Sequence, residues 1–288
     1  MAREFRELED CSRNGQVYDR IPCSLLEGVV VDPTAIRTYA ILEDSHWWFL
    51  GRREVIGRLL EARLAGPLRI LDWGCGTGGN FRMLSRFGRV TSVDASDLSL
   101  ELCRARGMSD VIKAATLQEF PVQDQYDLVT NFDVLEHIAD DVGFLRDLHR
   151  VLRDNGHVLV TVPAYQFLWS DLDRLLGHVR RYNKRDLVRC FEKAGFTVSV
   201  ASYFNSFLAV PFIAVRWTQT RTKRASTLKD YAMELHPWLN NLFLFLMTLE
   251  APIVPRMPMP FGTSIILLAK KQGQLGVTKR APVRAIFN

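Results

Sequence analysis

A glycine-rich turn directly after a short apolar segment is the feature that most constrains the fold of this chain. The apolar segment, residues 68–73, reads LRILDW, and the turn behind it, residues 74–80, reads GCGTGGN. Glycines let the backbone approach a ligand closely, and a helix that begins behind the turn offers unpaired amides to an anionic group. A strand, a glycine-rich turn and a helix in this order are typical of nucleotide-binding α/β folds.

Short apolar segments alternate with amphipathic helical patterns through the rest of the chain. After 68–73, the pattern predicts strands at 89–94, 111–114, 126–132, 157–162, 196–203 and 264–269, with a helix at 80–87 among those between them. In the helix after the second strand, Leu98, Leu102 and Ala105 are expected to form the buried face. Alternation of this kind implies a parallel sheet with crossover helices. The predicted fold class is α/β: a Rossmann-like doubly wound seven-stranded sheet, mostly parallel, with the last strand antiparallel.

Helical segments are expected on both sides of this core. Asp32 and Pro33 begin a helical pattern, and Gly66 and Pro67 end the next one. The predicted organisation is a disordered N-terminus at 1–31, an N-terminal helical cap at 32–65, a Rossmann-like core at 66–203, a helical insertion or lid between strands six and seven at 204–262, the last core strand at 263–270, and a loose basic tail at 271–288.

The residue types at the turn indicate which ligand it binds. Asp72 stands where the first strand ends, and a carboxylate there repels a pyrophosphate but attracts an ammonium group. The turn also has no Lys or Arg to hold phosphates. S-adenosylmethionine carries an ammonium group and no phosphate, so we predict it as the cofactor, with S-adenosylhomocysteine as its product. Two alternatives remain: an NAD-dependent oxidoreductase on a Rossmann fold, and a non-catalytic methyltransferase-like binding module.

Further cofactor contacts are expected along the same sheet edge. Asp94 closes the second strand, where an acidic side chain can accept both ribose hydroxyls, although it could instead cap the helix that begins at Ser96. Thr116 and Leu117 are expected to flank the adenine, and Arg52 to bind the methionyl carboxylate. The remaining predicted contacts of the turn and the second strand are Gly74, Cys75, Gly76, Gly78 and Ala95.

Four segments between residues 68 and 163 resemble the successive motifs of class I S-adenosylmethionine-dependent methyltransferases: ILDWGCGTGGN, VTSVDAS, YDLVTNFDVLEHI and RVLRDNGHVLVTVP. The flanking segments EDSHWWFLGRR, LWSDLDRLLGHVRRY and PFGTSIILLAKK resemble the methyltransferase type 12 group, often associated with cell-envelope sugar or lipid assembly. Ubiquinone-pathway O-methyltransferases are similar at a greater distance. The resemblance implies that Asn131, Phe132 and Asp133 edge the cofactor pocket, with Glu136 and His137 behind it; capping of a buried helix is the alternative for Asp133 and Glu136.

The acceptor is expected beyond the fifth strand, where an open sheet places its substrate crevice. His178, in the segment GHVRRY, is the preferred general base there, with His137 and Tyr182 as further catalytic candidates. A histidine on a surface loop is the alternative for His178. No metal site is predicted, because no two histidines are spaced i, i+4 and because Asp171, Asp173 and His178 together make only a faint metal site. The predicted reaction transfers a methyl group to an oxygen atom of an acceptor. The acceptor is an unidentified small molecule or a glycan-linked or lipid-like molecule.

Charge and composition restrict the partners. The formal net charge is only +5, and no stretch interleaves aromatic with basic residues, so nucleic acid is not an expected partner. Charges in the first ten residues, and five irregularly spaced cysteines, favour a cytoplasmic protein with reduced thiols. Apolar segments at 207–217 and 242–254 flank a basic run at 216–229, which suggests peripheral contact with the inner face of a membrane. Packing of these helices on the sheet is the alternative.

Overall fold

The computed structural model describes residues 33–121, 125–214 and 235–272. Its centre is a seven-stranded sheet with the order β3-β2-β1-β4-β5-β7-β6. β7 runs antiparallel to both of its neighbours, and the other neighbouring strands are parallel. The predicted fold class is confirmed. The strands are β1 Leu68–Trp73, β2 Gly88–Asp94, β3 Val111–Lys113, β4 Tyr126–Phe132, β5 Leu152–Pro163, β6 Phe196–Phe204 and β7 Ser264–Lys271.

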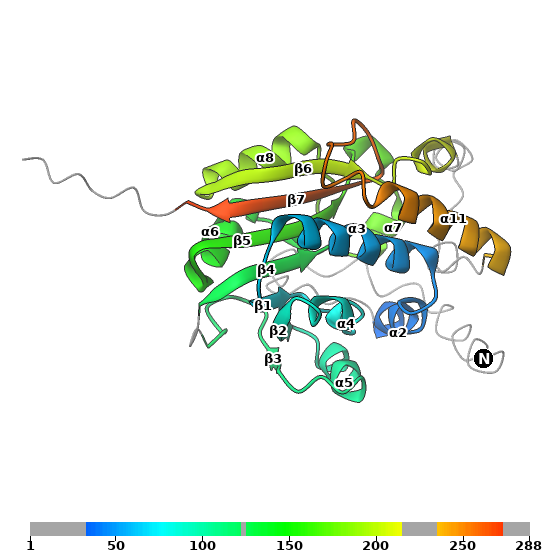
Figure 1. Cartoon of the computed structure of the whole chain (residues 1–288). Coiled ribbons are helices and arrows are strands. Elements are labelled where there is room, and N and C mark those ends of the chain that lie inside the picture. The colour runs from blue at the N-terminus through cyan, green and yellow to red at the C-terminus, as the bar shows by residue number, and fades with distance from the viewer. Residues whose placement is uncertain (1–32, 122–124, 215–234, 273–288) are drawn as a thin grey trace, which may run out of the picture.

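Helices cover both faces of the sheet (Figure 1). From β1 the chain moves outward through α4 (Phe81–Leu84), β2, α5 (Asp97–Ala105) and β3; from β4 it moves the other way through α6 (Asp141–Val151), β5 and α8 (Lys184–Lys193). Crossovers between parallel strands are right-handed, so opposite directions of travel place the two sets of helices on opposite faces. The strand order therefore reverses between β1 and β4, which opens a crevice at the carboxyl ends of these two strands.

Some predicted boundaries were wrong. The helix predicted at 80–87 is the single turn α4, β3 ends one residue early, and β5 begins at Leu152 instead of at residue 157. The longer β5 follows from pairing, because Leu152 lies beside Tyr126 of β4 although Asn155 and Gly156 resemble a turn. Asn155 has a φ of +64°, and the pairing register shifts between Tyr126 and Leu128, so the turn residues form an irregularity within β5 instead of ending the strand.

The predicted buried face of α5 was also wrong. Leu98 and Leu102 are only half-buried and Ala105 is exposed, whereas Leu100 and Cys103 are fully buried. α5 lies at the end of the sheet, in contact with β2, β3 and the N-terminal helix α2 (Pro33–Leu42). The side of the helix that faces inward is set by these neighbours, which the spacing of leucines within the helix does not reveal.

The N-terminal cap consists of α2 and α3 (Trp47–Arg63), and α3 packs against α11 (Pro237–Glu250), the helix that precedes the last strand. The two helices approach closely at Gly51, where a Cβ atom would lie 2.6 Å from Cβ of Met247. Glycine is therefore required for this contact. The amide of Trp47 donates a hydrogen bond of 2.8 Å to Oδ1 of Asn240, which joins the start of α3 to α11.

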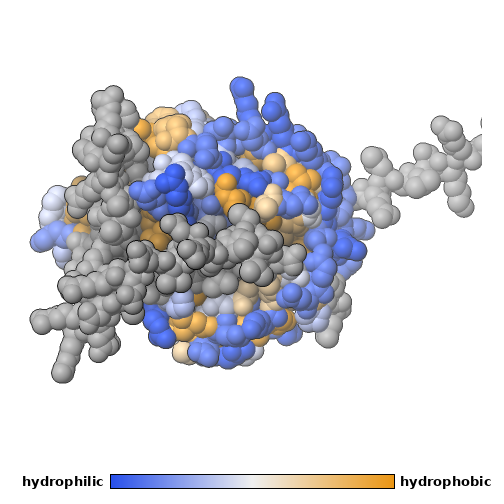
Figure 2. Space-filling model, turned by 180° about the vertical axis from the view of Figure 1, so that it is seen from behind, coloured by the Kyte–Doolittle hydropathy of each residue, from blue (hydrophilic) through white to orange (hydrophobic). Residues whose placement is uncertain are grey.

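The described part of the insertion at 204–262 contains two helices, one that begins at residue 209 and a second, α11, with turns before and after them. The basic run at 216–229, the N-terminus 1–31 and most of the tail lie outside the described residues. Within the described part, no helix is both long and apolar enough to cross a membrane. On the face seen in Figure 2, most visible described residues are hydrophilic, and the apolar ones form small groups.

Candidate active site

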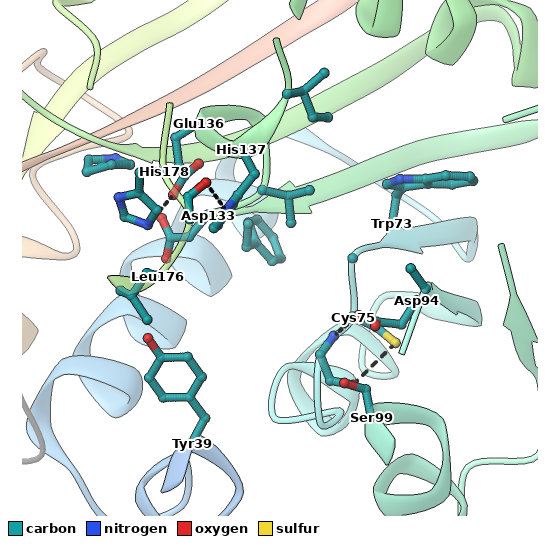
Figure 3. A pocket seen from close by; sticks show the side chains of 18 of the residues that line it. Tyr39, Trp73, Cys75, Asp94, Ser99, Asp133, Glu136, His137, Leu176 and His178 are labelled. Atoms are coloured by element: carbon teal, nitrogen blue, oxygen red, sulfur yellow. Dashed lines mark hydrogen bonds and ion pairs between the residues drawn. The ribbon is translucent and has the colours of Figure 1, made fainter. Parts of the chain in front are cut away.

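A cavity of about 1340 Å³ opens where the strand order reverses. One side is formed by the glycine-rich turn and the end of β2, with Trp73, Cys75 and Asp94 in its wall. The other side is formed by the segments that follow β4 and β5. Figure 3 shows Glu136 and His178 there, across the cavity from Asp94. The cavity thus connects the predicted cofactor residues with the predicted catalytic residues.

The glycine-rich turn is held by a buried glutamate that the sequence did not predict. The Thr77 hydroxyl donates a hydrogen bond to the Glu43 carboxylate, and Nη2 of Arg106 lies 3.3 Å from the same carboxylate. A Cβ atom at Gly79 would lie 2.4 Å from Cδ of Glu43, so only glycine leaves room for it. Burial raises the pKa of Glu43, which the bond from Thr77 and the charge of Arg106 partly offset. The segment directly after α2 is therefore fixed to the glycine-rich turn.

Asp94 ties β2 to the glycine-rich turn. Its Oδ2 accepts from the Gly76 amide at 2.9 Å, and its Oδ1 accepts from the Ser96 amide at 2.9 Å. The hydroxyl of Ser96, and not Asp94, caps α5 by accepting from the Ser99 amide. The carboxylate lines the cavity, where the acceptor positions that protein donors leave open can receive hydroxyl groups. Burial raises the pKa of Asp94, although the amide hydrogen bonds oppose this.

Asp72 lies behind the cavity wall, and its carboxylate is incompletely satisfied. Oδ1 accepts from the Thr130 hydroxyl at 2.6 Å, whereas the buried Oδ2 has no hydrogen-bond partner among the described residues. Burial raises the pKa of Asp72 to about 6, and the charges of Asp94 and Glu43 add to this effect. A positive group in the cavity would interact favourably with this carboxylate through its field rather than by direct contact.

At the end of β4, Asp133 adopts a left-handed backbone conformation with φ of +54°. Few side chains other than glycine adopt it, although aspartate does so more readily than most. Its amide donates to the Thr161 carbonyl at 2.9 Å, and its Oδ1 accepts from the Thr161 hydroxyl at 3.0 Å. Its Oδ2 forms an ion pair with Arg52 of α3. Strained backbone held from two sides is frequent at functional sites.

His178 is oriented by a buried carboxylate. Its Nδ1 lies 2.8 Å from Oδ1 of Asp173 in α7 (Asp171–Leu175), and Arg181 donates to both oxygens of Asp173 at 2.7 and 3.0 Å. Burial alone would raise the pKa of Asp173, but hydrogen bonds from His178 and Arg181 outweigh it and hold the pKa well below its usual range. An ionised carboxylate only accepts, so Nδ1 of His178 carries the proton and Nε2 has the free lone pair.

Glu136 and His137, both in the short helix η3 (Leu135–His137), lie next to His178. One ligating atom from each of these three residues lies within 4.8 Å of the others. Burial raises the pKa of Glu136 well above its usual value, and the charge of Asp133 adds to this. Burial and the neighbouring His178 lower the pKa of His137 to about 4. Glu136 and His137 both line the cavity.

Most of the predicted site residues line the cavity. Tyr182 does not, and this prediction is corrected: its buried hydroxyl donates to Oδ2 of Asp141 at 3.0 Å, because the backbone bridge between Tyr182 and Ala164 turns the side chain into the core. Asp72, Gly78 and Asn131 lie outside the lining, and Asn131 donates to the Trp73 carbonyl at 3.2 Å. The predicted residues that do line the cavity are Arg52, Gly74, Cys75, Gly76, Asp94, Ala95, Thr116, Leu117, Phe132, Asp133, His137 and His178.

Comparison with known proteins agrees with this geometry. A family model described as a methyltransferase domain matches residues 48–199, just over half of the chain. The chain belongs to this methyltransferase family. A relative from Mycolicibacterium smegmatis, named a probable S-adenosylmethionine-dependent methyltransferase, is 34% identical over 169 residues, which cover 57% of this chain and 65% of the relative. The match thus spans slightly less than two thirds of that relative's length.

Two further similar proteins are named for methylation of different atoms, oxygen in one and nitrogen in the other. The ubiquinone biosynthesis O-methyltransferase of Aeromonas salmonicida is 30% identical over 197 residues, covering 58% of this chain and 83% of that protein. The structure of a Haemonchus contortus phosphoethanolamine N-methyltransferase, solved with S-adenosylhomocysteine, shares the fold at a TM-score of 0.53 and 17% identity, covering 83% of this chain and 57% of that chain. The family model and the shared fold confirm the predicted class I methyltransferase family, and the Mycolicibacterium smegmatis relative is the one named for S-adenosylmethionine.

Proposed function

We propose that this methyltransferase transfers the methyl group of S-adenosylmethionine to an oxygen of an amphiphilic acceptor, either a small molecule or a lipid- or glycan-linked one. The observation that supports this most is that Asp94 and His178 stand on opposite sides of one and the same cavity. Its volume of about 1340 Å³ exceeds the range of roughly 300–1000 Å³ that is usual for one ligand. There is room for a cofactor and an acceptor together.

The cofactor side fits S-adenosylmethionine in charge and shape. The Asp94 carboxylate lines the cavity and would accept the ribose hydroxyls, and Thr116 and Leu117 offer a wall for the adenine. The unpartnered Oδ2 of Asp72 favours an ammonium group nearby. Arg52, already paired with Asp133, has its Nε without a partner among the described residues and faces the cavity wall, where the cofactor's carboxylate would lie.

The acceptor side supplies a group that removes a proton. When bound, S-adenosylmethionine supplies an electrophilic methyl group on a sulfonium. With that methyl group as the electrophile, Nε2 of His178 would take the proton of the acceptor hydroxyl, and S-adenosylhomocysteine would be the leaving group. Asp173 then stabilises the imidazolium through Nδ1–H. The relatives named O-methyltransferases favour oxygen as the methylated atom.

Apolar walls favour an acceptor with a hydrophobic part. Trp47, Trp48 and Phe212 line the cavity next to Leu168 and Leu176. Trp48 also stacks on Phe204 and Trp47 packs against Phe212, so these rings have a structural role as well. A purely polar substrate would leave this surface exposed to water, which costs about 25 cal/mol per Å².

The best test uses the purified full chain with methyl-labelled S-adenosylmethionine, a cell lysate and a lipid extract. We expect label in the lipid or glycolipid fraction, and a large reduction with His178→Ala. A chain that binds the cofactor but labels no fraction would be a binding module. Binding of NAD in place of S-adenosylmethionine would instead support the oxidoreductase alternative.

Peripheral membrane contact is part of the proposal and rests on α11. Trp238, Leu242, Phe245 and Leu249 follow one another at helical spacing, and each is between 42% and 61% exposed. The opposite side of α11 packs on the protein through Met247 and Glu250. The basic run that precedes α11 in the sequence, at 216–229, would complement an anionic lipid surface at about 1 kcal/mol per basic residue.

Sedimentation with liposomes tests this contact. The wild-type chain should sediment with anionic vesicles at low salt, and less so at high salt, because screening weakens the attraction. Phe245→Ser should reduce sedimentation, whereas Ile41→Ser, which changes a similarly exposed apolar residue of α2, should not. If wild type and both variants remain in the supernatant in all conditions, the membrane contact is wrong while the methyl-transfer proposal stands.

A further inference from the structure

Three potential metal ligands meet at the acceptor side of the cavity. Glu136 is only 1% exposed, and neither of its carboxylate oxygens has a hydrogen-bond partner among the described residues. A buried carboxylate without partners is costly, and such groups are normally paired or coordinate a metal. Nε2 of His178 lies 3.9 Å from Oε1 of Glu136, too far for a hydrogen bond. A ligand between these atoms would satisfy both.

The two imidazoles are oriented in the way that metal-binding histidines usually are. Nδ1 of His178 bonds the Asp173 carboxylate at 2.8 Å, and Nδ1 of His137 lies 3.2 Å from the Gly177 carbonyl. Both acceptors fix the proton on Nδ1, which leaves a lone pair on each Nε2. A carboxylate or a carbonyl that holds the distal nitrogen is the common outer shell of a metal-bound histidine. The rings lie edge to face with centroids 4.8 Å apart.

We propose that Glu136, His137 and His178 bind one divalent transition-metal cation, such as Zn²⁺. Two imidazoles and one carboxylate favour this class over Mg²⁺ and Ca²⁺, which take mainly oxygen ligands. The three ligating atoms lie within 4.8 Å of one another, and a tetrahedral ion with bonds of about 2.1 Å holds its ligands about 3.4 Å apart. Loading therefore draws the three side chains together. Three protein ligands leave a coordination position open towards the cavity.

This site deepens the proposed methyl transfer and, in its chemical consequence, rests on it. An acceptor hydroxyl in the open position would lose its proton to solvent water, because coordination lowers its pKa. The oxygen then forms the C–O bond as the C–S bond breaks. In the loaded protein the cation takes over the activation that His178 alone performs in the metal-free protein. The binding of the ion itself does not depend on any methyl transfer.

Cobalt serves as the probe because its visible absorption reports the ligands. The full chain, freed of metal with a chelator, is titrated with Co²⁺ in the absence of S-adenosylmethionine. We expect saturation at one Co²⁺ per chain and displacement by one equivalent of Zn²⁺. Glu136→Gln, which keeps the size of the side chain, and His137→Ala should each weaken binding at least tenfold. The control His149→Ala, which changes a histidine of α6 outside the cavity lining, should bind as wild type does.

Two results would overturn the site. One is binding that remains unchanged in folded Glu136→Gln, and the other is an intense thiolate charge-transfer band, which would place the ion on cysteines. Should His137→Ala fail to fold, Glu136→Gln still decides the question. S-adenosylhomocysteine titration is run in parallel. Cofactor binding and methyl transfer without Co²⁺ binding would refute only this site, whereas Co²⁺ binding without methyl transfer to any fraction would refute only the proposed function.

Discussion

Replacing Asp94 with alanine tests the cofactor assignment most directly. Asp94 lines the cavity, and its carboxylate is the proposed acceptor of the ribose hydroxyls. Hydrogen bonds to a charged group contribute about 1.5–3 kcal/mol each. Loss of one such bond weakens binding at least about tenfold, and loss of two at the lower value, about 3 kcal/mol, weakens it about 150-fold. Calorimetric titration with S-adenosylhomocysteine measures the change.

The alanine also leaves the amides of Gly76 and Ser96 without their acceptor, so a general loosening of the turn must be separated from lost ribose bonds. Ser96→Ala is the matched control. It removes the cap of α5, which costs about 1 kcal/mol of stability, but leaves the Asp94 carboxylate in place. We expect Ser96→Ala to lower the melting temperature and to bind S-adenosylhomocysteine nearly as wild type does. Folded Asp94→Ala with wild-type affinity would refute the ribose assignment.

Three further predictions concern single residues. His178→Ala should lower turnover at least about 100-fold while affinity for S-adenosylhomocysteine stays within about twofold; a parallel loss of affinity would give His178 a role in cofactor binding. Burial favours protonated Asp72 in the fold, so wild-type stability without cofactor should fall as pH rises from 4 to 6, by about 3 kcal/mol from this group. Urea unfolding should show Asp72→Asn gaining stability relative to wild type over that range, and a constant difference would contradict it. Gly79→Ala should displace Glu43 and weaken cofactor binding in a titration, whereas Gly57→Ala, whose Cβ would meet its nearest atom at 3.9 Å, should not; equal affinities would be the contrary result.

The sheet could be predicted from the sequence because each strand carries its own signal. Buried parallel strands are continuous apolar segments, and both β1 and β4 were predicted with their observed ends. The glycine-rich turn and Asp94 follow from the same local pattern. The predictions of the inward-facing side of α5 and of the length of β5 were wrong, because both features depend on neighbouring elements that are far away in the sequence.

The parts of the site that the sequence missed are also long-range. Glu43 contacts a turn that lies 34 residues later in the chain, and no local pattern marks an acid at the end of a short helix as its partner. Asp173 is only five residues before His178, so the spacing was visible. The pairing, however, requires the chain to turn back directly after α7. The open ligand positions of Glu136 depend on what the fold leaves unpaired, which composition does not reveal.

Helix α3 links the apolar surface of the insertion to the reaction site through two consecutive residues. Gly51 fits against Met247 of α11, and Arg52 pairs with Asp133 at the end of β4. Asp133 is in turn fixed by Thr161 of β5, in the wall that the acceptor and the cofactor would share. Close-packed contacts transmit displacement instead of absorbing it. The position of α11 and the position of the Arg52–Asp133 pair are therefore coupled, so the proposed lipid contact, if it holds α11, would also help to fix the geometry in which the methyl group is transferred.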